Sequence, residues 1–408
     1  MQADCPALPP GWRMAPLEQV ACVRTGLALS RHTPPAAQEV PYIRVANVQD
    51  GYLDLQDIKH MRLDPRQIAR YALAVGDVLL TEGGNFDMLG RGDVWQGQIA
   101  PCVHQNHVFV VKTERSQLLP HFLSALTASS HGRRFFLRYG KRSTSLASIS
   151  ISQLRQFPVL LPPMAQQQVM VDALQCWDAA LQTSDELIAN SRQQQANLQH
   201  FLLRPRSDQG WRQVRLGDAV RIDAESLVRS KWPPQEPIRY LRIEHLKQGD
   251  IWRAPDLHSL ADAPARARRV VHAGDVLLSL VRPDLQGLAR ALPEHEGCIA
   301  SSGMAVLTPG AQISTDFLYH SLFGAALQQQ IASLVAGSSY PQLSSKQLHD
   351  LQIWLPPPPA QTEISASLNQ AAHRLQLEHA ARAALLQQKM ELIERFIAGA
   401  LPFQRTEI

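Results

Sequence analysis

The chain spells the same five residues twice, and this repeat constrains the fold more than any other feature. Gly-Asp-Val-Leu-Leu stands at residues 76–80 and again at residues 274–278. Further matches fall on nearly the same offset: residues 11–13 with 210–212, Tyr42 with Tyr240, and Leu154 with Leu348. The offset drifts by a few residues and never reverses, as small loop insertions produce. The chain is therefore predicted to be a tandem duplication of two domain-sized units.

Composition limits the class of protein. The 408 residues carry a formal net charge of +4, and hydrophobic residues make up 45% of them, enough for a core in each copy. A mildly basic balance permits a polyanionic partner. No apolar run approaches the ~18 residues of a membrane span, and the first residues lack a signal-peptide pattern. The five cysteines have no C-x-x-C spacing, so we expect reduced thiols in a cytoplasmic protein with no membrane partner.

Each copy has the same predicted order of elements. Apolar alternation through Ile43 and Val45, or through Leu241 and Ile243, predicts a strand. Each Gly-Asp pair is predicted to be a turn that leads into a buried strand. Helices are predicted over residues 120–136 and 315–331, followed by a polar loop, a short helix, a strand and a proline stop.

A long helix is predicted after each proline stop. Residues 165–203 contain neither Gly nor Pro, and their apolar residues keep spacings of three and four: Met170, Leu174, Trp177, Leu181 and Ile188. The second copy shows the same pattern from Ile364 to Phe396. Such spacing is typical of a helix that packs along another helix. Polar residues in the middle of both seams, Ser191 and Glu378 among them, argue against a homo-oligomeric zipper, so the two helices are predicted to pair antiparallel.

The predicted fold class is therefore α+β, with two similar mixed α/β domains, each followed by a long helix. The predicted boundaries are residues 1–163 for the first domain, 164–203 for its helix, 204–357 for the second domain, 358–400 for its helix, and 401–408 for a tail. Two similar domains joined by paired helices suggest a pseudo-two-fold molecule that contacts a long ligand at two places a fixed distance apart.

Motifs for catalysis are weak. The Asp-Pro-Pro-aromatic type of methyltransferase signature is missing. Asp57-Ile58-Lys59 fits the minimal Asp-x-Lys of metal-dependent nucleases, but such a triplet is common by chance, and a solvated turn is favoured. Cys102, His104 and His107 could ligate a metal, but the second copy lacks both histidines, so a structural role is favoured and no metal or cofactor is predicted.

Basic residues form the more informative clusters. The stretch 133–142 interleaves Lys and Arg with Phe and Tyr, has no acidic residue and leads into a Ser/Thr loop. Lys and Arg neutralise phosphates, while Ser, Thr and Gln reach phosphates or base edges. For any single residue a solvated helix face is an equal alternative. The candidate DNA-binding residues are Arg133, Arg134, Lys141, Arg142, Ser143, Thr144 and Ser145 in the first copy, and Arg268, Arg269, Arg282, Ser338, Ser339, Tyr340 and Gln342 in the second.

The duplicated layout, the Gly-Asp-Val-Leu-Leu turns and the proline stops resemble the specificity subunit of type I restriction-modification systems. The polar loop precedes Ile149-Ser150 in one copy and Leu343-Ser344 in the other, and a Leu-Pro-Pro stop precedes each long helix. The resemblance covers essentially the whole chain. An acidic-Gln pair usual after the prolines is replaced by Gln167-Gln168 and Thr362-Glu363.

This resemblance implies a non-catalytic subunit that directs methylation and restriction to a bipartite, asymmetric site in double-stranded DNA. Each domain would recognise one half-site, and the paired helices would set the gap. The implied partners are modification (methyltransferase) subunits, two in number, which use S-adenosylmethionine, and restriction subunits, which translocate and cleave DNA with ATP. Arg-guanine and Gln-adenine pairs are the expected readout, and by type and position the candidates are Arg91, Arg142, Arg282 and Gln342.

Two other classes of function remain open at the level of sequence. A nuclease or methyltransferase with an unrecognised site would act without partners. A protein scaffold would use the same helices without binding nucleic acid, and a steep salt dependence of DNA affinity would exclude it.

Overall fold

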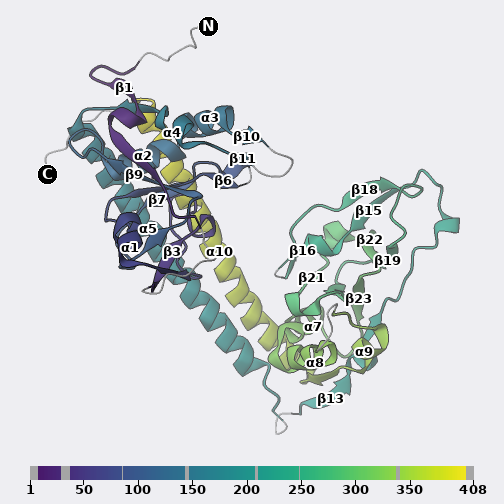
Figure 1. Cartoon of the computed structure of the whole chain (residues 1–408). Coiled ribbons are helices and arrows are strands. Elements are labelled where there is room, and N and C mark those ends of the chain that lie inside the picture. Colours follow the sequence, from purple (N-terminus) through teal and green to yellow (C-terminus); the bar gives the residue numbers. More distant parts are fainter. Residues whose placement is uncertain are drawn as a thin grey trace. The chain divides into compact units, whose positions relative to one another are not determined.

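The computed structural model describes residues 8–28, 37–84, 86–142, 147–206, 210–247, 249–336 and 341–400. The chain divides into two compact units (Figure 1). The first unit holds residues 1–185 and 380–408, and the second holds residues 186–379. Each unit therefore contains one copy of the sequence repeat together with parts of both long helices. The two tandem α+β domains, each followed by a long helix, confirm the predicted fold class.

The first unit is built from short sheets covered by helices. Its sheets, in hydrogen-bonded order, are β2 (Ala21–Thr25), β9 (Val108–Thr113), β5 (Val78–Thr81) and β7 (Gly92–Val94); β4 (Lys59–Leu63), β3 (Gln38–Ile43) and β8 (Val103–His104); β1 (Arg13–Pro16) and β12 (Pro158–Leu161); and β10 (Lys141–Arg142), β11 (Ala147–Ser148) and β6 (Gly83–Gly84). Its shorter helices are α1 (Pro65–Tyr71), α2 (Pro120–Ala128), α3 (Ser130–Tyr139) and α4 (Ile151–Arg155).

The second unit repeats this plan. Its sheets are β14 (Val220–Ile222), β23 (Met304–Pro309), β20 (Val276–Ser279) and β21 (Leu288–Arg290); β18 (Asp256–Ser259), β15 (Pro237–Leu241), β22 (Cys298–Ser301) and β19 (Ala267–Val271); β13 (Arg212–Arg215) and β24 (Gln352–Leu355); and β16 (Leu246–Lys247) and β17 (Asp250–Ile251). Its shorter helices are α6 (Leu216–Ala219), α7 (Thr315–Phe323), α8 (Ala325–Val335) and α9 (Ser345–Asp350). In chain order, strand β19 stands where the first unit has helix α1.

The repeated Gly-Asp turn has the same geometry in both units. Gly76 and Gly274 have φ angles of 93° and 90°, which L side chains rarely adopt. The buried Asp77 carboxylate accepts a hydrogen bond from the backbone N–H of Ala74 at 2.9 Å, and Asp275 accepts one from His272 at 2.8 Å. Strands β5 and β20, which follow, are buried at every position. The predicted turn and buried strand are thus present twice.

Two predictions of local structure were wrong in detail. Each helix predicted over residues 120–136 and 315–331 is two helices, because the chain leaves the helical conformation at Ser129 and at Gly324. The strands predicted through Val45 and Ile243 end earlier, since both residues begin a turn of 3-10 helix. The apolar periodicity of the sequence did not reveal these breaks, because apolar residues continue on both sides of each break.

The long helices are α5 (Met164–Leu202) and α10 (Pro358–Ile397). Within each unit their segments pair antiparallel. In the first unit Asp178 forms an ion pair with Lys389, and Asp185 pairs with Arg382 at 2.5 Å. In the second unit the Ser191 hydroxyl donates to Glu378 at 2.8 Å. Outside this polar stretch the seam is apolar: Leu174 packs in the core of the first unit with Phe396.

A buried glutamine fastens each long helix to its domain. The Gln167 side chain accepts from the N–H of Leu119 and donates to the carbonyls of Gln117 and Pro162, at 2.9 to 3.0 Å. Gln361 makes the corresponding bonds to Ser314, Gln312 and Pro356. In the sequence, Gln167 was matched with Thr362 of the second copy, and this match was wrong by one residue, since Gln361 is the equivalent. The equivalent positions lie at the same distance after each Leu-Pro-Pro.

Among the described residues, no helix combines the length and the apolar character that crossing a membrane would require.

Candidate nucleic-acid interface

In both units the residue that ends the polar loop is hydrogen-bonded to the chain that follows the Gly-Asp-Val-Leu-Leu strand. The N–H of Ile149 donates to the carbonyl of Glu82, and the N–H of Leu343 donates to that of Leu280, both at 2.9 Å. The chain just after the loop is therefore anchored in each copy to the end of a fully buried strand. We call this region the loop edge of each unit: residues 82–84 with 141–142 and 147–149 in the first, and 280–282 with 341–343 in the second.

The loop edge of the second unit brings two of the predicted residues together. Val281 forms a bridge with Gln342, and the N–H of Arg282 donates to the carbonyl of Pro341 at 2.9 Å. Arg282 has a φ of 46°, and both its side chain and that of Gln342 are exposed. Arginine and glutamine are the side chains that form paired hydrogen bonds with guanine and adenine. The role of both residues in reading bases stays a prediction.

The loop edge of the first unit is a small sheet. Strand β11 lies between β10 and β6, with Ser148 opposite both Lys141 and Gly83. Lys141 is exposed. The predicted residues Ser143, Thr144, Ser145, Ser338, Ser339 and Tyr340, together with the side chain of Arg142, lie outside the described residues, so their roles stay predictions.

Two other predicted basic residues of the first unit lie beside the turn that contains Asp57. Arg133, on α3, forms an ion pair with Asp50, and Arg91 donates to the Gln49 side chain at 3.5 Å. Arg134 is exposed, and its Nε donates to the carbonyl of Ser130 at 3.2 Å. The structure therefore places Arg91 and Arg133 beside one turn, residues 44–57.

The two neighbouring arginines of the second unit differ in their surroundings. Arg269 forms an ion pair with Asp223 at 2.8 Å and donates to the carbonyl of Ser302 at 3.0 Å. Burial lowers the pKa of its guanidinium. Arg268 is exposed and donates to the carbonyl of Ala265 at 3.3 Å. Of the two, Arg268 has the solvent-facing position that a phosphate contact requires, whereas the Arg269 side chain is engaged by Asp223 and Ser302 within the domain.

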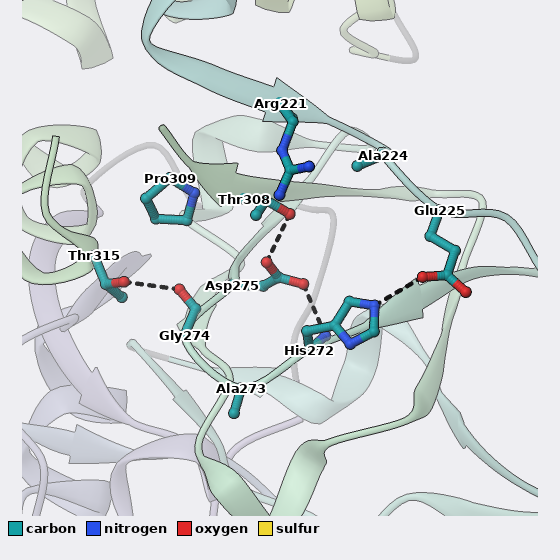
Figure 2. A pocket seen from close by; sticks show the side chains of 10 residues that line it. All are labelled: Arg221, Ala224, Glu225, His272, Ala273, Gly274, Asp275, Thr308, Pro309 and Thr315. Atoms are coloured by element: carbon teal, nitrogen blue, oxygen red, sulfur yellow. Dashed lines mark hydrogen bonds and ion pairs between the residues drawn. The ribbon is translucent and has the colours of Figure 1, made fainter. Parts of the chain in front are cut away.

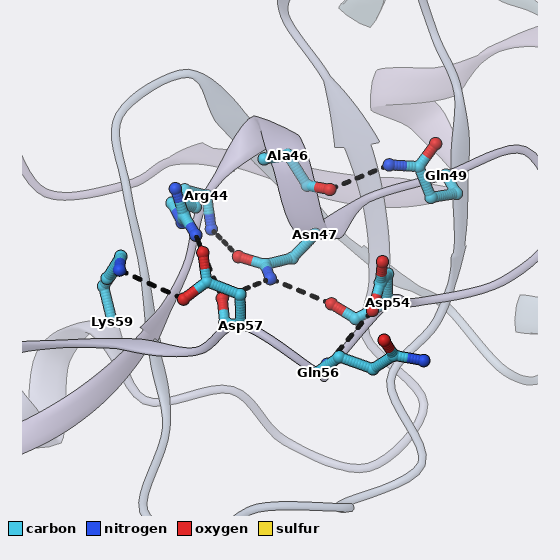
Figure 3. Close-up of polar contacts among 8 residues, drawn as sticks. All are labelled: Arg44, Ala46, Asn47, Gln49, Asp54, Gln56, Asp57 and Lys59. Atoms are coloured by element: carbon cyan, nitrogen blue, oxygen red, sulfur yellow. Dashed lines mark hydrogen bonds and ion pairs between the residues drawn. The ribbon is translucent and has the colours of Figure 1, made fainter. Parts of the chain in front are cut away.

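The Asp-x-Lys triplet forms part of a polar turn (Figure 3). Asp57 forms ion pairs with Arg44 and, at 3.1 Å, with Lys59, and its side chain is 66% exposed. The hydrogen bonds from Lys59 and Arg44 lower the pKa of the Asp57 carboxyl. Asn47 ties the turn together by donating to the carbonyls of Asp54 and Asp57. These contacts describe the solvated turn that was favoured over a nuclease site.

The group Cys102, His104 and His107 does not form a metal site in the described part of the chain. His104 is buried, its Nδ1 lies 3.2 Å from the carbonyl of Tyr71, and burial lowers its pKa to about 4. Burial also raises the pKa of the Cys102 thiol to about 12. Both groups are therefore neutral at pH 7, as expected of core residues.

A polar cleft of about 400 Å³ lies beside the Gly-Asp turn of the second unit (Figure 2). His272 bridges Glu225 and Glu296, at 2.9 and 2.8 Å, and hydrogen bonds to these carboxylates raise the pKa of its imidazole. The buried Asp275 accepts from the Thr308 hydroxyl at 2.7 Å. Each of these acidic and basic groups already has a partner within the cleft, so the arrangement supports the turn.

Known proteins resemble this chain over 40% to 97% of its length. The family model "Type I restriction modification DNA specificity domain" matches residues 9–190 and 209–387. A putative type I restriction enzyme MjaX specificity subunit from Methanocaldococcus jannaschii is 19% identical over 97% of this chain and 94% of its own. The EcoKI specificity subunit from Escherichia coli is 25% identical over 40% of this chain and 35% of its own. A chain from a structure of a type I R-M system has a TM-score of 0.60 at 20% identity, covering 97% of this chain and all of that one.

Proposed function

Because the chain belongs to the family of type I restriction modification DNA specificity domains, we propose that it recognises an asymmetric, bipartite DNA site, one domain per half-site. The observation that carries this proposal is the pair of loop edges. Both are anchored by the same backbone hydrogen bond to equivalent buried strands, yet they present different side chains. Two equivalent scaffolds with different contact residues are what recognition of two different half-sites requires.

The exposed side chains at these edges, and the other candidate residues outside them, have suitable chemistry. Arg282 and Gln342 can form paired hydrogen bonds with base edges in the major groove. Lys141, Arg134 and Arg268 can neutralise phosphates, which adds affinity without sequence preference. Arg91 and Arg133 lie close enough to the turn at residues 44–57 to act with it. The residues of both loops named from the sequence complete the proposed set.

The partners we propose are two modification subunits, which bind S-adenosylmethionine and methylate, and restriction subunits, which use ATP. The chain itself is proposed to be non-catalytic, since the Asp-x-Lys triplet and the Cys-His group both have structural roles. We place the protein in the cytoplasm, where the four described cysteines, all free, would remain reduced.

We further propose that α5 and α10 set the gap between the half-sites. Seven residues added to each helix, within 184–195 and 378–389, should preserve the heptad phase. Such an insertion lengthens a helix by ~10.5 Å, or about three base pairs at ~3.4 Å each. Three base pairs also rotate the second half-site by roughly 100° at ~10.5 pairs per turn. The expected result is a longer gap between unchanged half-sites, or loss of methylation. Full activity at the original gap would contradict the proposal.

The decisive test is a map of methylated DNA sites after co-expression of the chain with the methyltransferase encoded by a neighbouring gene. We expect methylation of one asymmetric sequence made of two specific parts separated by an unspecified gap. Methylation by the methyltransferase alone at the same sites, or methylation or cleavage by this chain alone, would contradict the assignment.

A further inference from the structure

Trp252 is an exposed tryptophan held in a fixed orientation between two cations. Its side chain is 48% exposed, although its indole N–H donates to the carbonyl of Glu244 at 2.9 Å. The Arg253 guanidinium lies 4.1 Å from the ring centroid, and the Lys247 ammonium lies 5.2 Å from it. Both cations are exposed, and neither has an ion-pair partner among the described residues. An anchored apolar ring beside two exposed cations suits an anionic partner.

The first unit shows where this element lies in the shared fold. Asp54 donates its N–H to the carbonyl of Asn47 at 2.8 Å, and Trp252 donates its N–H to that of His245 at 3.1 Å. Arg44 and Arg242 begin the two equivalent 3-10 turns. The segment 245–252 is therefore the counterpart of the turn that contacts Arg91 and Arg133 in the first unit.

The same segment is tied to the strand next to the second loop edge. Gly249 forms a bridge with Ala289 of β21, just as Gly51 donates its N–H to Gly92 of β7. Strand β21 pairs with β20, and β20 leads directly into Leu280 and Arg282. The hairpin of β16 and β17 thus lies beside the edge strand β21, which is the neighbour of the strand that leads into the loop edge.

We infer that Trp252, Lys247 and Arg253 form a second contact with DNA, made to the sugar-phosphate backbone of the half-site that the second domain recognises. This inference rests on the proposed function and adds a contact surface to it. The two cations would neutralise phosphates, and the indole would pack on the apolar edge of a deoxyribose. Contacts to phosphate and deoxyribose do not distinguish bases, so this surface contributes affinity and not sequence preference.

The test measures DNA binding by the full chain in complex with its modification subunits, as a function of salt. The probes are a duplex that contains the methylated site and a duplex of unrelated sequence. The double variant Lys247→Gln/Arg253→Gln should reduce the slope of log affinity against log salt by about 2, since each phosphate contact contributes about 0.9. Trp252→Ala should weaken the affinity of the complex for both duplexes by a similar factor, roughly fivefold.

A matched control is Trp232→Ala, which removes a tryptophan of similar exposure, 51%, from a different loop of the same unit. Melting temperatures of all variants establish that each is folded. The inference is overturned if the slope and affinity of the variants equal those of the original complex, or if the variants change the methylated sequence. Absence of site-specific binding by the original complex would instead contradict the proposed function.

Discussion

The two units share their buried framework and differ at the surface that we assign to DNA. Both contain the Gly-Asp turn, the buried strand that follows, and the buried glutamine that fastens a long helix. By contrast, helix α3 carries three arginines, while its counterpart α8 has no charged residue. Divergence at exposed positions is what two scaffolds evolving toward different half-sites would show, because exposed side chains can change at little cost in stability, whereas most core substitutions destabilise.

The largest effect that would test this comparison is an exchange of the second domain. Residues 204–357 would be replaced by the corresponding residues of a relative, with both long helices kept. Because the core of each domain is completed by segments of the long helices, which the exchange keeps, we expect a folded protein that methylates a site with only one half changed. Sequencing of methylated DNA measures the outcome. A change in both halves, or in neither, would contradict one domain per half-site.

The buried glutamines offer the next largest effect. Gln167→Leu and Gln361→Leu would each leave three backbone groups without their partners, of which one carbonyl is buried and the other two groups belong to partly or fully exposed residues. An unsatisfied buried group costs about 1 to 3 kcal/mol, so we expect each variant to lose stability by about that amount, which chemical denaturation measures. Gln168→Leu is the matched control, since Gln168 is next in the sequence to Gln167 and its side chain is exposed. Equal stability of all three variants would show that the glutamines do not fasten the helices.

The glutamines also mark how far sequence can predict this fold. The repeat predicted the duplication, the Gly-Asp turns and the long helices, because these depend on periodic apolar positions and on glycine. It could not distinguish Gln167 from Gln168, since burial of a polar side chain depends on carbonyls far away in sequence. The site was predicted only in part for the same reason. Loop chemistry indicated Arg282 and Gln342, but nothing local showed that Arg269 is paired with Asp223.

His104 distinguishes the units by their response to acid. It is buried in the first unit, whereas Ala300 stands at the equivalent position opposite Leu241 in the second. The folded pKa of about 4 lies below the ordinary 6.5. Stability is therefore complete above pH 6.5 and is lost as the pH falls toward 4, by at most about 3 kcal/mol, because only the unfolded state takes up the proton.

The variant His104→Ala should remove this pH dependence. Denaturation at pH 7 and at pH 5 measures the difference in unfolding free energy for the original chain and the variant. The comparison uses the change between the two pH values, since the variant also leaves a cavity that lowers stability equally at both. An unchanged pH slope in the variant would show that His104 is not the group responsible.

A smaller effect of opposite sign is expected at His272 in the second unit. Glu296 and Glu225 raise the pKa of this imidazole, so its contribution is present below pH 6.5 and is lost as the pH rises through the raised value. The group is 45% exposed, and solvent screening keeps the contribution small. His272→Gln should reduce stability more at pH 6 than at pH 9, as thermal melting at both values measures. A larger loss at pH 9 would contradict this reading.

The smallest expected effect concerns Lys59, where the units differ again. Lys59 lies opposite Tyr42 in the strand register, and Asp256 lies opposite the equivalent Tyr240. Both positions form an exposed ion pair, to Asp57 in one unit and to Arg242 in the other.

The variant Lys59→Gln tests whether the Asp-x-Lys triplet is catalytic, because a catalytic lysine could not be replaced without loss of an activity. Since the triplet forms a solvated turn, we expect methylation by the complex to continue at the original rate and sites. Lys112→Gln, an exposed lysine on another strand, is the control. A loss of methylation specific to Lys59→Gln, in a complex that still binds its DNA site, would restore the catalytic alternative for the first unit, because an exposed ion pair of this kind is too weak to account for such a loss.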